Sequence, residues 1–276
     1  MQLFLGIDGG GTGCRVAVSD RQGRIFGRAE AGPSNIASDF AGSVQNILAA
    51  SDMALAQAGG VAATVVAGLG LAGANAAGAA QRLRGALPFA RIAIETDAIT
   101  ALRGALGGED GIVAAIGTGS VFGARVNGTI HQIGGWGLML GDEGSGAWIG
   151  RAALSAALRA ADGFEGMTPL LADLLREFDG PQGIIAFSLS ARPADFAGLA
   201  PRMIANQDPS ARAIMKRAKA DIAEAISVLQ AGHSLPVTFL GGLGAHFCTL
   251  FTGQFPIRAA VGTALDGALL LAREAG

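Results

Sequence analysis

The chain has 276 residues, of which half are hydrophobic and 15% are charged, and its formal net charge is −2. This length allows one large domain or two of average size with a well-developed core, and the charge balance argues against a nucleic-acid surface or an acidic interaction tail. The 44 glycines are spread through apolar sequence, which indicates many tight turns rather than a low-complexity segment.

The first third of the chain predicts a mixed sheet covered by helices. Three strands are expected first, at residues 2–7, 14–19 and 24–30. Strands and helices then alternate: a helix at 41–58 capped by Ser38 or Asp39, a strand at 62–68, a helix at 76–86, a strand at 91–95 and a helix from about 98. Strand–helix alternation of this kind favours an α/β fold.

Glycines and acidic residues at 107–111 predict a boundary between domains at 1–109 and 110–276. Beyond it the pattern restarts, with strands at 112–116, 121–126 and 129–133, a helical region at 143–230, a strand at 236–240 and a final helix from about 262. The clearest helix of that region begins at Asp208-Pro209. Two similar halves suggest a nucleotide held in a cleft between two domains, with the option that the final helix packs back on the first domain.

The first expected strand ends on a carboxylate and a run of glycines. Asp8 is followed by Gly9, Gly10, Gly11 and Thr12, a composition whose backbone N–H groups can close around a phosphate. Because Asp8 would repel phosphate directly, it implies a cation between them, which we expect to be hydrated Mg²⁺. The alternative is a glycine-rich hairpin turn in which Asp8 is only a turn former.

Two later glycine turns also follow apolar strands. Gly117-Thr118-Gly119-Ser120 suits a second phosphate clamp, although alone it is an ordinary turn composition. Gly241, Gly242 and Gly244 follow the strand near Val237, and their missing side chains would let an adenine lie against the backbone. A strand-to-helix connection that needs glycine for steric reasons alone is the alternative there.

Asp97 follows the strand at 91–95 and begins a helix, so it has two interpretations. It can be a helix N-cap, which is the commoner role of such a residue. It can also be a general base at the carboxyl end of a sheet strand, where open α/β sheets bind their ligands. In that role its carboxylate would accept the proton of a hydroxyl that attacks a γ-phosphate.

The densest glycine-rich stretch covers residues 133–146 and contains Trp136 followed by Asp142 and Glu143. The two carboxylates can complement the dipole of the next helix, or they can bind a polyhydroxylated ligand beside exposed backbone amides. Asn35, which follows Pro33-Ser34, can add an amide to such a site or can be a turn residue. The three histidines have no ligand spacing and are assigned no chemistry.

The two cysteines, Cys14 and Cys248, form neither a disulfide framework nor a metal motif, so we expect both to be reduced. No secretory signal is visible at the first strand. The uncharged stretch at 58–80 is long enough to raise the question of a membrane span, but its glycines, Thr64 and Asn75 favour a strand, a turn and a helix start. We therefore expect a soluble, cytoplasmic protein without a membrane or nucleic-acid partner.

Six motifs, taken in this order, resemble those of N-acetylglucosamine and glucosamine kinases in the BadF/BadG/BcrA/BcrD ATPase family. They are Asp8 to Thr12, Pro33-Ser34-Asn35, Thr96-Asp97-Ala98, Gly117 to Ser120, Gly134-Gly135-Trp136-Gly137 and Gly141-Asp142-Glu143-Gly144-Ser145. The resemblance covers essentially the whole chain. It implies two ribonuclease H-like (actin-like ATPase) domains with ATP and sugar in the cleft between them, and an ATP-dependent hexosamine kinase acting on the 6-hydroxyl of an amino sugar.

The resemblance also implies roles for individual residues. Asp97 is the catalytic base, and Asp8 holds Mg²⁺. The expected sugar-binding residues are Asn35, Thr118, Gly135, Trp136, Asp142 and Glu143. The expected ATP-binding residues are Gly9, Gly10, Gly11, Thr12, Thr118, Gly119, Ser120, Gly241, Gly242 and Gly244. The role of Glu143 stays open between orienting Asp142 and contacting the sugar.

One position departs from the family pattern. Mammalian-type N-acetylglucosamine kinases carry an asparagine after Gly-Thr-Gly-Ser that contacts the sugar, whereas this chain has Val121. Loss of that amide puts selectivity for the N-acetyl group in doubt and leaves free glucosamine open as the substrate. A homodimer is common among such proteins, but no residue pattern here demonstrates one.

Two other classes of function remain as alternatives. An ATP-driven activator of a radical dehydratase shares the family name and holds an iron–sulfur cluster through cysteines, but Cys14 and Cys248 follow two different glycine turns. A non-catalytic sugar sensor needs an output module, and no helix-turn-helix extension is visible in this sequence.

Overall fold

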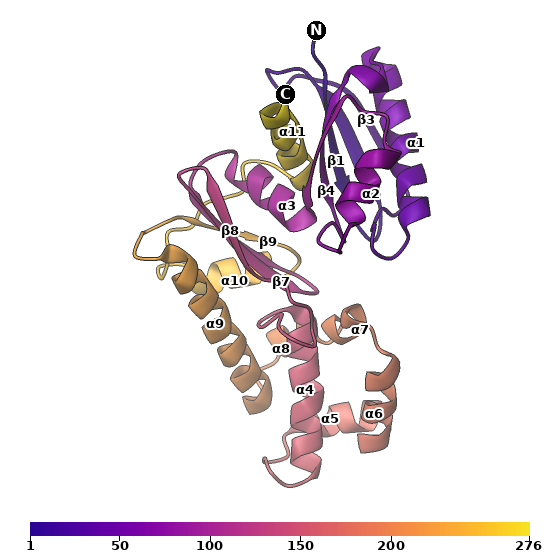
Figure 1. The fold of residues 1–276 in the computed structure, drawn as a ribbon. Coiled ribbons are helices and arrows are strands. Elements are labelled where there is room, and N and C mark those ends of the chain that lie inside the picture. Colours follow the sequence, from indigo (N-terminus) through magenta and orange to yellow (C-terminus); the bar gives the residue numbers. More distant parts are fainter. The chain divides into compact units, whose positions relative to one another are not determined.

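The computed structural model describes all 276 residues and divides into two compact α/β units, each built around one sheet (Figure 1). The first unit consists of Met1–Asp110 together with Ala259–Gly276, and the second consists of Gly111–Arg258. The mixed α/β class expected from the sequence is confirmed, and each unit is described separately below.

The first unit contains a five-stranded sheet in the order β3-β2-β1-β4-β5. Its strands are β1 (Phe4–Gly9), β2 (Cys14–Ser19), β3 (Ile25–Ala31), β4 (Val66–Leu71) and β5 (Arg91–Thr96). β1, β2 and β3 are antiparallel neighbours, whereas β4 and β5 run parallel to β1. This is the ribonuclease H-like arrangement, and it brings the carboxyl ends of β1, β4 and β5 to one edge of the sheet.

Alternating side chains of β1 bury the two faces of this sheet under different helices. Leu5 and Ile7 share a core with Ile47 of α1 (Phe40–Ala58), which packs on β2 and β3. On the other face, Phe4 contacts Ala272 of α11 (Ala264–Ala275), which packs on β1, β4 and α3 (Asp97–Leu106). The last helix of the chain therefore completes the first unit (Figure 1).

The close approach of α11 to the sheet depends on glycine. A Cβ on Gly68 of β4 would overlap the carbonyl oxygen of Ala268, and a Cβ on Gly6 of β1 would meet the side chain of Leu269 at 2.6 Å. Apolar residues on both elements are buried where they meet, so close backbone packing replaces side-chain packing at these two positions.

The second unit contains a four-stranded sheet in the order β8-β7-β6-β9. Its strands are β6 (Gly111–Ile116), β7 (Ser120–Val126), β8 (Thr129–Gly134) and β9 (Val237–Leu240). β6, β7 and β8 form an antiparallel meander, and β9 runs parallel to β6. The carboxyl ends of β6 and β9 are therefore neighbours.

Seven helices accompany this sheet, and α4 and α9 are the longest and pack on each other (Figure 1). They are α4 (Gly146–Ala161), α5 (Pro169–Glu177), α6 (Gly180–Ser190), α7 (Pro193–Ala197), α8 (Ala200–Ala205), α9 (Pro209–Gln230) and α10 (Gly244–Phe251). As the sequence predicted, α9 buries Ile214, Ala218, Ile222 and Ile226 along one face.

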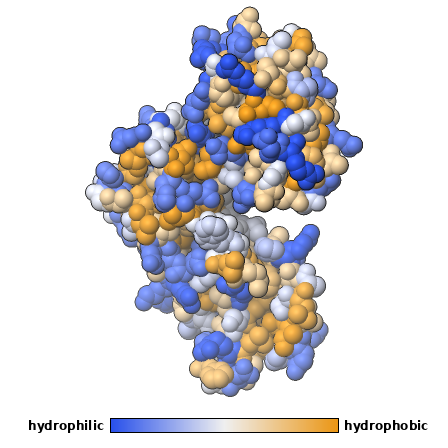
Figure 2. Space-filling model, viewed as in Figure 1, coloured by the Kyte–Doolittle hydropathy of each residue, from blue (hydrophilic) through white to orange (hydrophobic).

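Exposed apolar side chains gather on the second unit. Met139 and Leu140 are each 84% exposed, and Leu189 of α6 is 83% exposed. Figure 2 shows hydrophobic surface low in this unit, where α6 lies in Figure 1. A cavity of about 600 Å³ lies beside this surface and is lined by residues 136–140 of the glycine-rich loop and by α6.

Three predictions of secondary structure were wrong in detail. The strand expected at 62–68 begins only at Val66, because Ala62–Thr64 forms a 3₁₀ turn in which the Thr64 hydroxyl donates to the carbonyl oxygen of Val61 at 2.8 Å. α2 (Ala79–Ala86) begins three residues later than expected, after Gly78 with φ of 74°. α10 was foreseen only in the alternative interpretation of Gly241, Gly242 and Gly244 as a strand-to-helix connection, and its bounds were not predicted. No helix has the length and apolarity that crossing a bilayer requires.

Candidate active site

In the first unit, strand register brings two predicted site residues to the same sheet edge. Asp8 of β1 lies opposite Gly70 of β4, and Gly70 lies opposite Glu95 of β5. Asp97 follows β5 directly and begins α3. Parallel α/β sheets bind ligands at the carboxyl ends of their strands, so both carboxylates stand where such a sheet carries its chemistry.

Asp8 is a largely buried carboxylate with one cationic neighbour. Its side chain is 19% exposed, and its Oδ2 lies 3.7 Å from Nη1 of Arg15. Burial raises the pKa of Asp8, the Arg15 guanidinium lowers it, and the negative charge of Asp97 raises it further. The two aspartates therefore repel one another electrostatically, which is the situation a bound cation relieves.

Asp97 is not the N-cap of α3, so the capping interpretation is wrong. Thr96 is the cap, and its hydroxyl accepts a hydrogen bond from the N–H of Ile99 at 3.3 Å. The exposed Asp97 side chain accepts from the adjacent N–H of Ala98 at 2.9 Å. Because Thr96 caps α3, the carboxylate of Asp97 remains exposed to solvent in the first turn of this helix.

The glycine turn after β1 offers unused backbone donors. The N–H of Gly10 donates to the carbonyl oxygen of Gly13 at 2.9 Å, but the N–H groups of Gly11 and Thr12 have no partner within the chain. A Cβ on Gly10 or Gly11 would meet nothing within 4 Å. The fold itself does not require glycine at these two positions, whereas a ligand that approaches the backbone would.

Asn35 is held beside this turn. The N–H of Ser34 donates to the carbonyl oxygen of Gly10 at 2.9 Å, which ties the Asn35 loop to the glycine turn. Oδ1 of Asn35 accepts from the N–H of Ala37 at 3.0 Å and from that of Ser38 at 3.3 Å. Asn35 is therefore a turn residue, and its Nδ2 is left as the donor that a ligand can use.

In the second unit, two of the predicted glycine turns lie side by side. The N–H of Leu243 donates to the carbonyl oxygen of Ile116 at 3.0 Å, and a Cβ on Gly117 would be 3.7 Å from the nitrogen of Gly242. Gly241 has φ of 83° and a Cβ there would overlap the carbonyl oxygen of Ile116, so this glycine is structural. Gly242 is exposed and has open space around it.

The turn at 117–120 also receives the start of α4. The N–H groups of Gly146 and Ala147 donate to the carbonyl oxygens of Gly117 and Thr118 at 2.8 and 3.1 Å. Ser145 caps the helix by accepting from the N–H of Trp148 at 3.1 Å. These bonds orient the turn and leave the N–H groups of Thr118 and Gly119, with the exposed Thr118 hydroxyl, as its unused donors.

Asp142 holds the glycine-rich loop against this turn. It is 8% exposed, has φ of 60°, and its Oδ1 accepts from the N–H of Gly137 at 3.1 Å. Burial raises the pKa of Asp142, while hydrogen bonds from the backbone N–H groups of Gly137 and Ser120 lower it and the charge of Glu143 raises it. Gly135, Trp136 and Glu143 are exposed beside it, with Trp136 at 73%.

Sequence reasoning missed two residues that shape these sites. Arg15 of β2 belongs to no recognisable sequence motif. Its proximity to Asp8 follows only from the strand register, which places it opposite Asp8. Thr96 was grouped with Asp97 without being recognised as the cap. The cysteines lie in different units: Cys14 is buried in β2, where burial raises the pKa of its thiol to about 11, and Cys248 is half-buried in α10.

Comparison with known proteins identifies the family. The family model for the BadF/BadG/BcrA/BcrD ATPase family matches residues 5–246, which is most of the chain. The chain belongs to this family. Membership of an ATPase family implies the use of ATP, as expected from the sequence motifs.

Individual known proteins resemble the chain over most of its length. It is 34% identical over 231 residues to the glucosamine kinase GspK of Vibrio cholerae, which covers 80% of this chain and 78% of that one. It is 32% identical to an N-acetylmuramic acid/N-acetylglucosamine kinase of Clostridium acetobutylicum, covering 63% of this chain and 60% of that one. A solved structure from Chromobacterium violaceum, described as a candidate N-acetylglucosamine kinase, is 36% identical, covers 99% of both chains and has a TM-score of 0.83.

Proposed function

We propose that this BadF/BadG/BcrA/BcrD family member is a cytoplasmic ATP-dependent kinase that phosphorylates the 6-hydroxyl of an amino sugar, either glucosamine or N-acetylglucosamine. One observation supports the chemistry most directly: Asp97 presents an exposed carboxylate at the carboxyl end of β5 while Thr96 performs the capping. The names of the relatives support the substrate class.

In the proposed mechanism Asp97 is the general base. Its carboxylate accepts the proton of the sugar 6-hydroxyl as that oxygen forms a bond to the γ-phosphorus, and the bond from this phosphorus to the β–γ bridging oxygen breaks to release ADP. The first turn of α3 needs no side chain from Asp97 as its cap, so the carboxylate is available for the substrate.

In this proposal the hydrogen-bond donors to the ATP phosphates are backbone N–H groups of two glycine turns. We assign the unpaired N–H groups of Gly11 and Thr12 in the first unit and of Thr118 and Gly119 in the second to phosphate oxygens, with Gly9, Gly10 and Ser120 shaping the turns. Gly241, Gly242 and Gly244 are assigned to the adenine, with the open surface at Gly242 as the contact.

Asp8 is the residue assigned to Mg²⁺. Its largely buried carboxylate, whose negative charge is repelled by Asp97, fits a site that a hard cation stabilises. No group of three or more His, Cys, Asp or Glu side chains suited to a metal ion is present. Waters and phosphate oxygens would therefore complete the coordination, and the bound ion would neutralise charge on the phosphates.

The sugar is assigned to Asn35 in the first unit and to Thr118, Gly135, Trp136, Asp142 and Glu143 in the second. Nδ2 of Asn35 and the exposed Glu143 supply a donor and acceptors for hydroxyls. Because the Asp142 carboxylate accepts backbone hydrogen bonds from Gly137 and Ser120, we assign it mainly to holding the loop, with sugar contact as the additional role that the resemblance implies.

The experiment is to incubate the purified protein and Mg²⁺-ATP with glucosamine, N-acetylglucosamine, N-acetylmuramic acid, glucose or no sugar, and to follow ADP release. Turnover that requires an amino sugar, with ³¹P–¹H correlation spectra showing a phosphomonoester on carbon 6, is the expected result. Sugar-independent ADP release, or none with any of these sugars, would contradict the proposal.

A further inference from the structure

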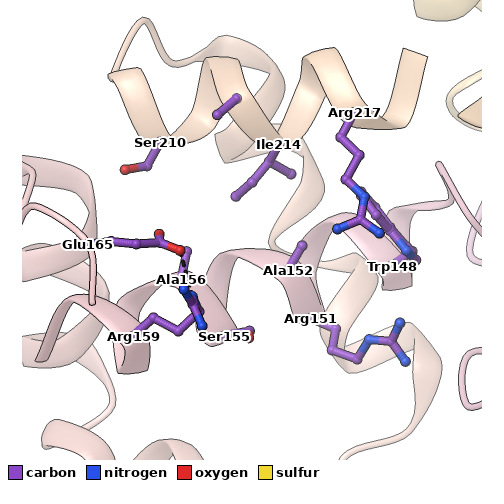
Figure 3. Close-up of a pocket in the computed structure, with 11 residues that line it drawn as sticks. Trp148, Arg151, Ala152, Ser155, Ala156, Arg159, Glu165, Ser210, Ile214 and Arg217 are labelled. Atoms are coloured by element: carbon purple, nitrogen blue, oxygen red, sulfur yellow. Dashed lines mark hydrogen bonds and ion pairs between the residues drawn. The ribbon is translucent and has the colours of Figure 1, made fainter. Parts of the chain in front are cut away.

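A second, basic cavity lies in the second unit, lined by α4, α9 and Glu165 in the turn after α4 (Figure 3). Its volume is about 460 Å³, within the range of small-molecule sites. Its charged lining residues are three arginines and one carboxylate: Arg151, Arg159, Arg217 and Glu165. This concentration of positive charge contrasts with the net charge of −2 of the whole chain.

Only one of the three arginines is neutralised inside the cavity. Nε of Arg159 lies 2.6 Å from Oε1 of Glu165, and Figure 3 shows this pair at one end. At the other end Arg217 forms a long ion pair of 3.9 Å with Asp221, which does not line the cavity, and Arg151 donates to the uncharged carbonyl oxygen of Leu138. Two guanidinium groups therefore line this end, and no carboxylate lines the cavity beside them.

The same end carries an aromatic wall. The guanidinium carbon of Arg217 lies 5.4 Å from the ring centre of Trp148, which is 6% exposed, and Figure 3 shows Arg217 of α9 standing over this ring. Ser155, Ser210 and Ile214 also line the cavity. The lining thus combines guanidinium N–H groups, hydroxyls and apolar surface.

We propose that this cavity binds a small phosphorylated metabolite, whose phosphate dianion contacts Arg217 and Arg151 and whose remainder lies along Trp148 and Ile214. Guanidinium groups form paired, charge-assisted hydrogen bonds with phosphate oxygens, and hydroxyl donors suit the polar remainder of such a molecule. The glycine turns do not line the cavity, so the proposal does not depend on the kinase function.

The cavity is connected to the glycine-rich loop through one residue. Arg151 lines the cavity and also holds the carbonyl oxygen of Leu138, four residues before Asp142. A phosphate that engages Arg151 competes for the same guanidinium. Occupancy of the cavity is therefore transmitted to the loop that carries Trp136.

The chain offers a direct reporter, because it contains two tryptophans and no tyrosine. In Trp136→Phe the remaining indole is Trp148, in the cavity wall. We expect its emission to change saturably with fructose 6-phosphate, more weakly with inorganic phosphate, and not with fructose. Isothermal titration calorimetry of the unmodified protein provides a second readout, and no change in emission together with no heat with fructose 6-phosphate would overturn the proposal.

Substitutions in the same background locate the site. Arg217→Gln should weaken fructose 6-phosphate binding by about ten-fold or more, because a charge-assisted pair is lost. Arg212→Gln removes an equal charge from an exposed position on the same helix outside the cavity and should leave binding unchanged. Loss of binding in Arg212→Gln or in Thr118→Val, with Arg217→Gln unaffected, would assign the phosphate elsewhere and overturn the proposal.

Discussion

The carboxylate of Asp142 occupies the space into which a side chain at residue 119 would extend: a Cβ on Gly119 would lie 2.7 Å from Oδ2 of Asp142. Gly119→Ala should therefore displace Asp142 from the N–H of Gly137 and destabilise the protein by about 1–3 kcal/mol, as overpacking does elsewhere. Thermal unfolding measures the loss. A melting temperature equal to that of the unmodified protein would show that the loop yields without cost.

Gly10→Ala is the contrasting substitution, because a Cβ there meets nothing within 4 Å. We expect the melting temperature to stay unchanged and the KM for ATP to rise about ten-fold, since the added methyl group would stand between the backbone and the phosphates. Steady-state kinetics at saturating sugar measures KM. If KM is unaltered, no phosphate approaches this part of the turn.

Asp97→Asn should lower kcat by about 10²- to 10⁴-fold, the range usual for loss of a general base, while leaving the melting temperature unchanged. The matched control is Thr96→Ala, which removes the cap of α3 and should cost about 1 kcal/mol of stability. Kinetics and thermal unfolding of both variants separate the two roles. A destabilised but active Asp97→Asn would return this residue to a structural role.

Asp8→Asn should change how stability depends on pH. Because the pKa of Asp8 is raised above 3.8 in the folded state, folding takes up a proton, and this contribution to stability is lost as pH rises through the raised pKa. The Asp8→Asn variant has no ionisable group at this position, so its stability does not decrease in this way as pH rises. Its stability relative to the unmodified protein should thus increase from pH 4 to 7 in urea unfolding without Mg²⁺; a constant difference would contradict the assigned shift.

Val121→Asn tests sugar selectivity. A Cβ on Gly135 would lie 3.2 Å from Cγ2 of Val121, so this side chain borders the glycine-rich loop. An amide at this position should raise kcat/KM for N-acetylglucosamine relative to glucosamine by about ten-fold, because it can pair with the N-acetyl group. Val121→Leu is the apolar control. An unchanged ratio in Val121→Asn would place the N-acetyl group elsewhere.

The ends of most strands could be predicted because turn chemistry marks them. Glycines directly follow Ile116 and Leu240, where β6 and β9 end, and the glycine run after Asp8 marks the end of β1 at Gly9. The element boundaries that no turn or capping residue marks could not be predicted. Ala62–Thr64 has a composition compatible with a strand, yet a local hydrogen bond of Thr64 folds it into a 3₁₀ turn. α10 lacks a capping side chain, so its start carries no sequence signal.

Residue type predicted where the candidate site residues lie better than it predicted their contacts. The carboxylates Asp8 and Asp97 stand at the expected sheet edge, because parallel strands bring their carboxyl ends together. The sequence alone could not indicate that Asp142 accepts hydrogen bonds from backbone N–H groups. This contact depends on the left-handed backbone of Asp142 and on its packing against the turn at 117–120. Nor could spacing reveal Arg15, whose role follows from strand pairing.

The return of α11 to the first sheet sets the order in which the protein can be completed during synthesis. The second unit is one continuous stretch, Gly111–Arg258, whereas β1 and β4 wait for Ala259–Gly276 to cover them. Domains fold as units while the chain emerges. We therefore expect a chain truncated after Arg258 and released from the ribosome to resist protease in Gly111–Arg258 while Met1–Asp110 remains cleavable.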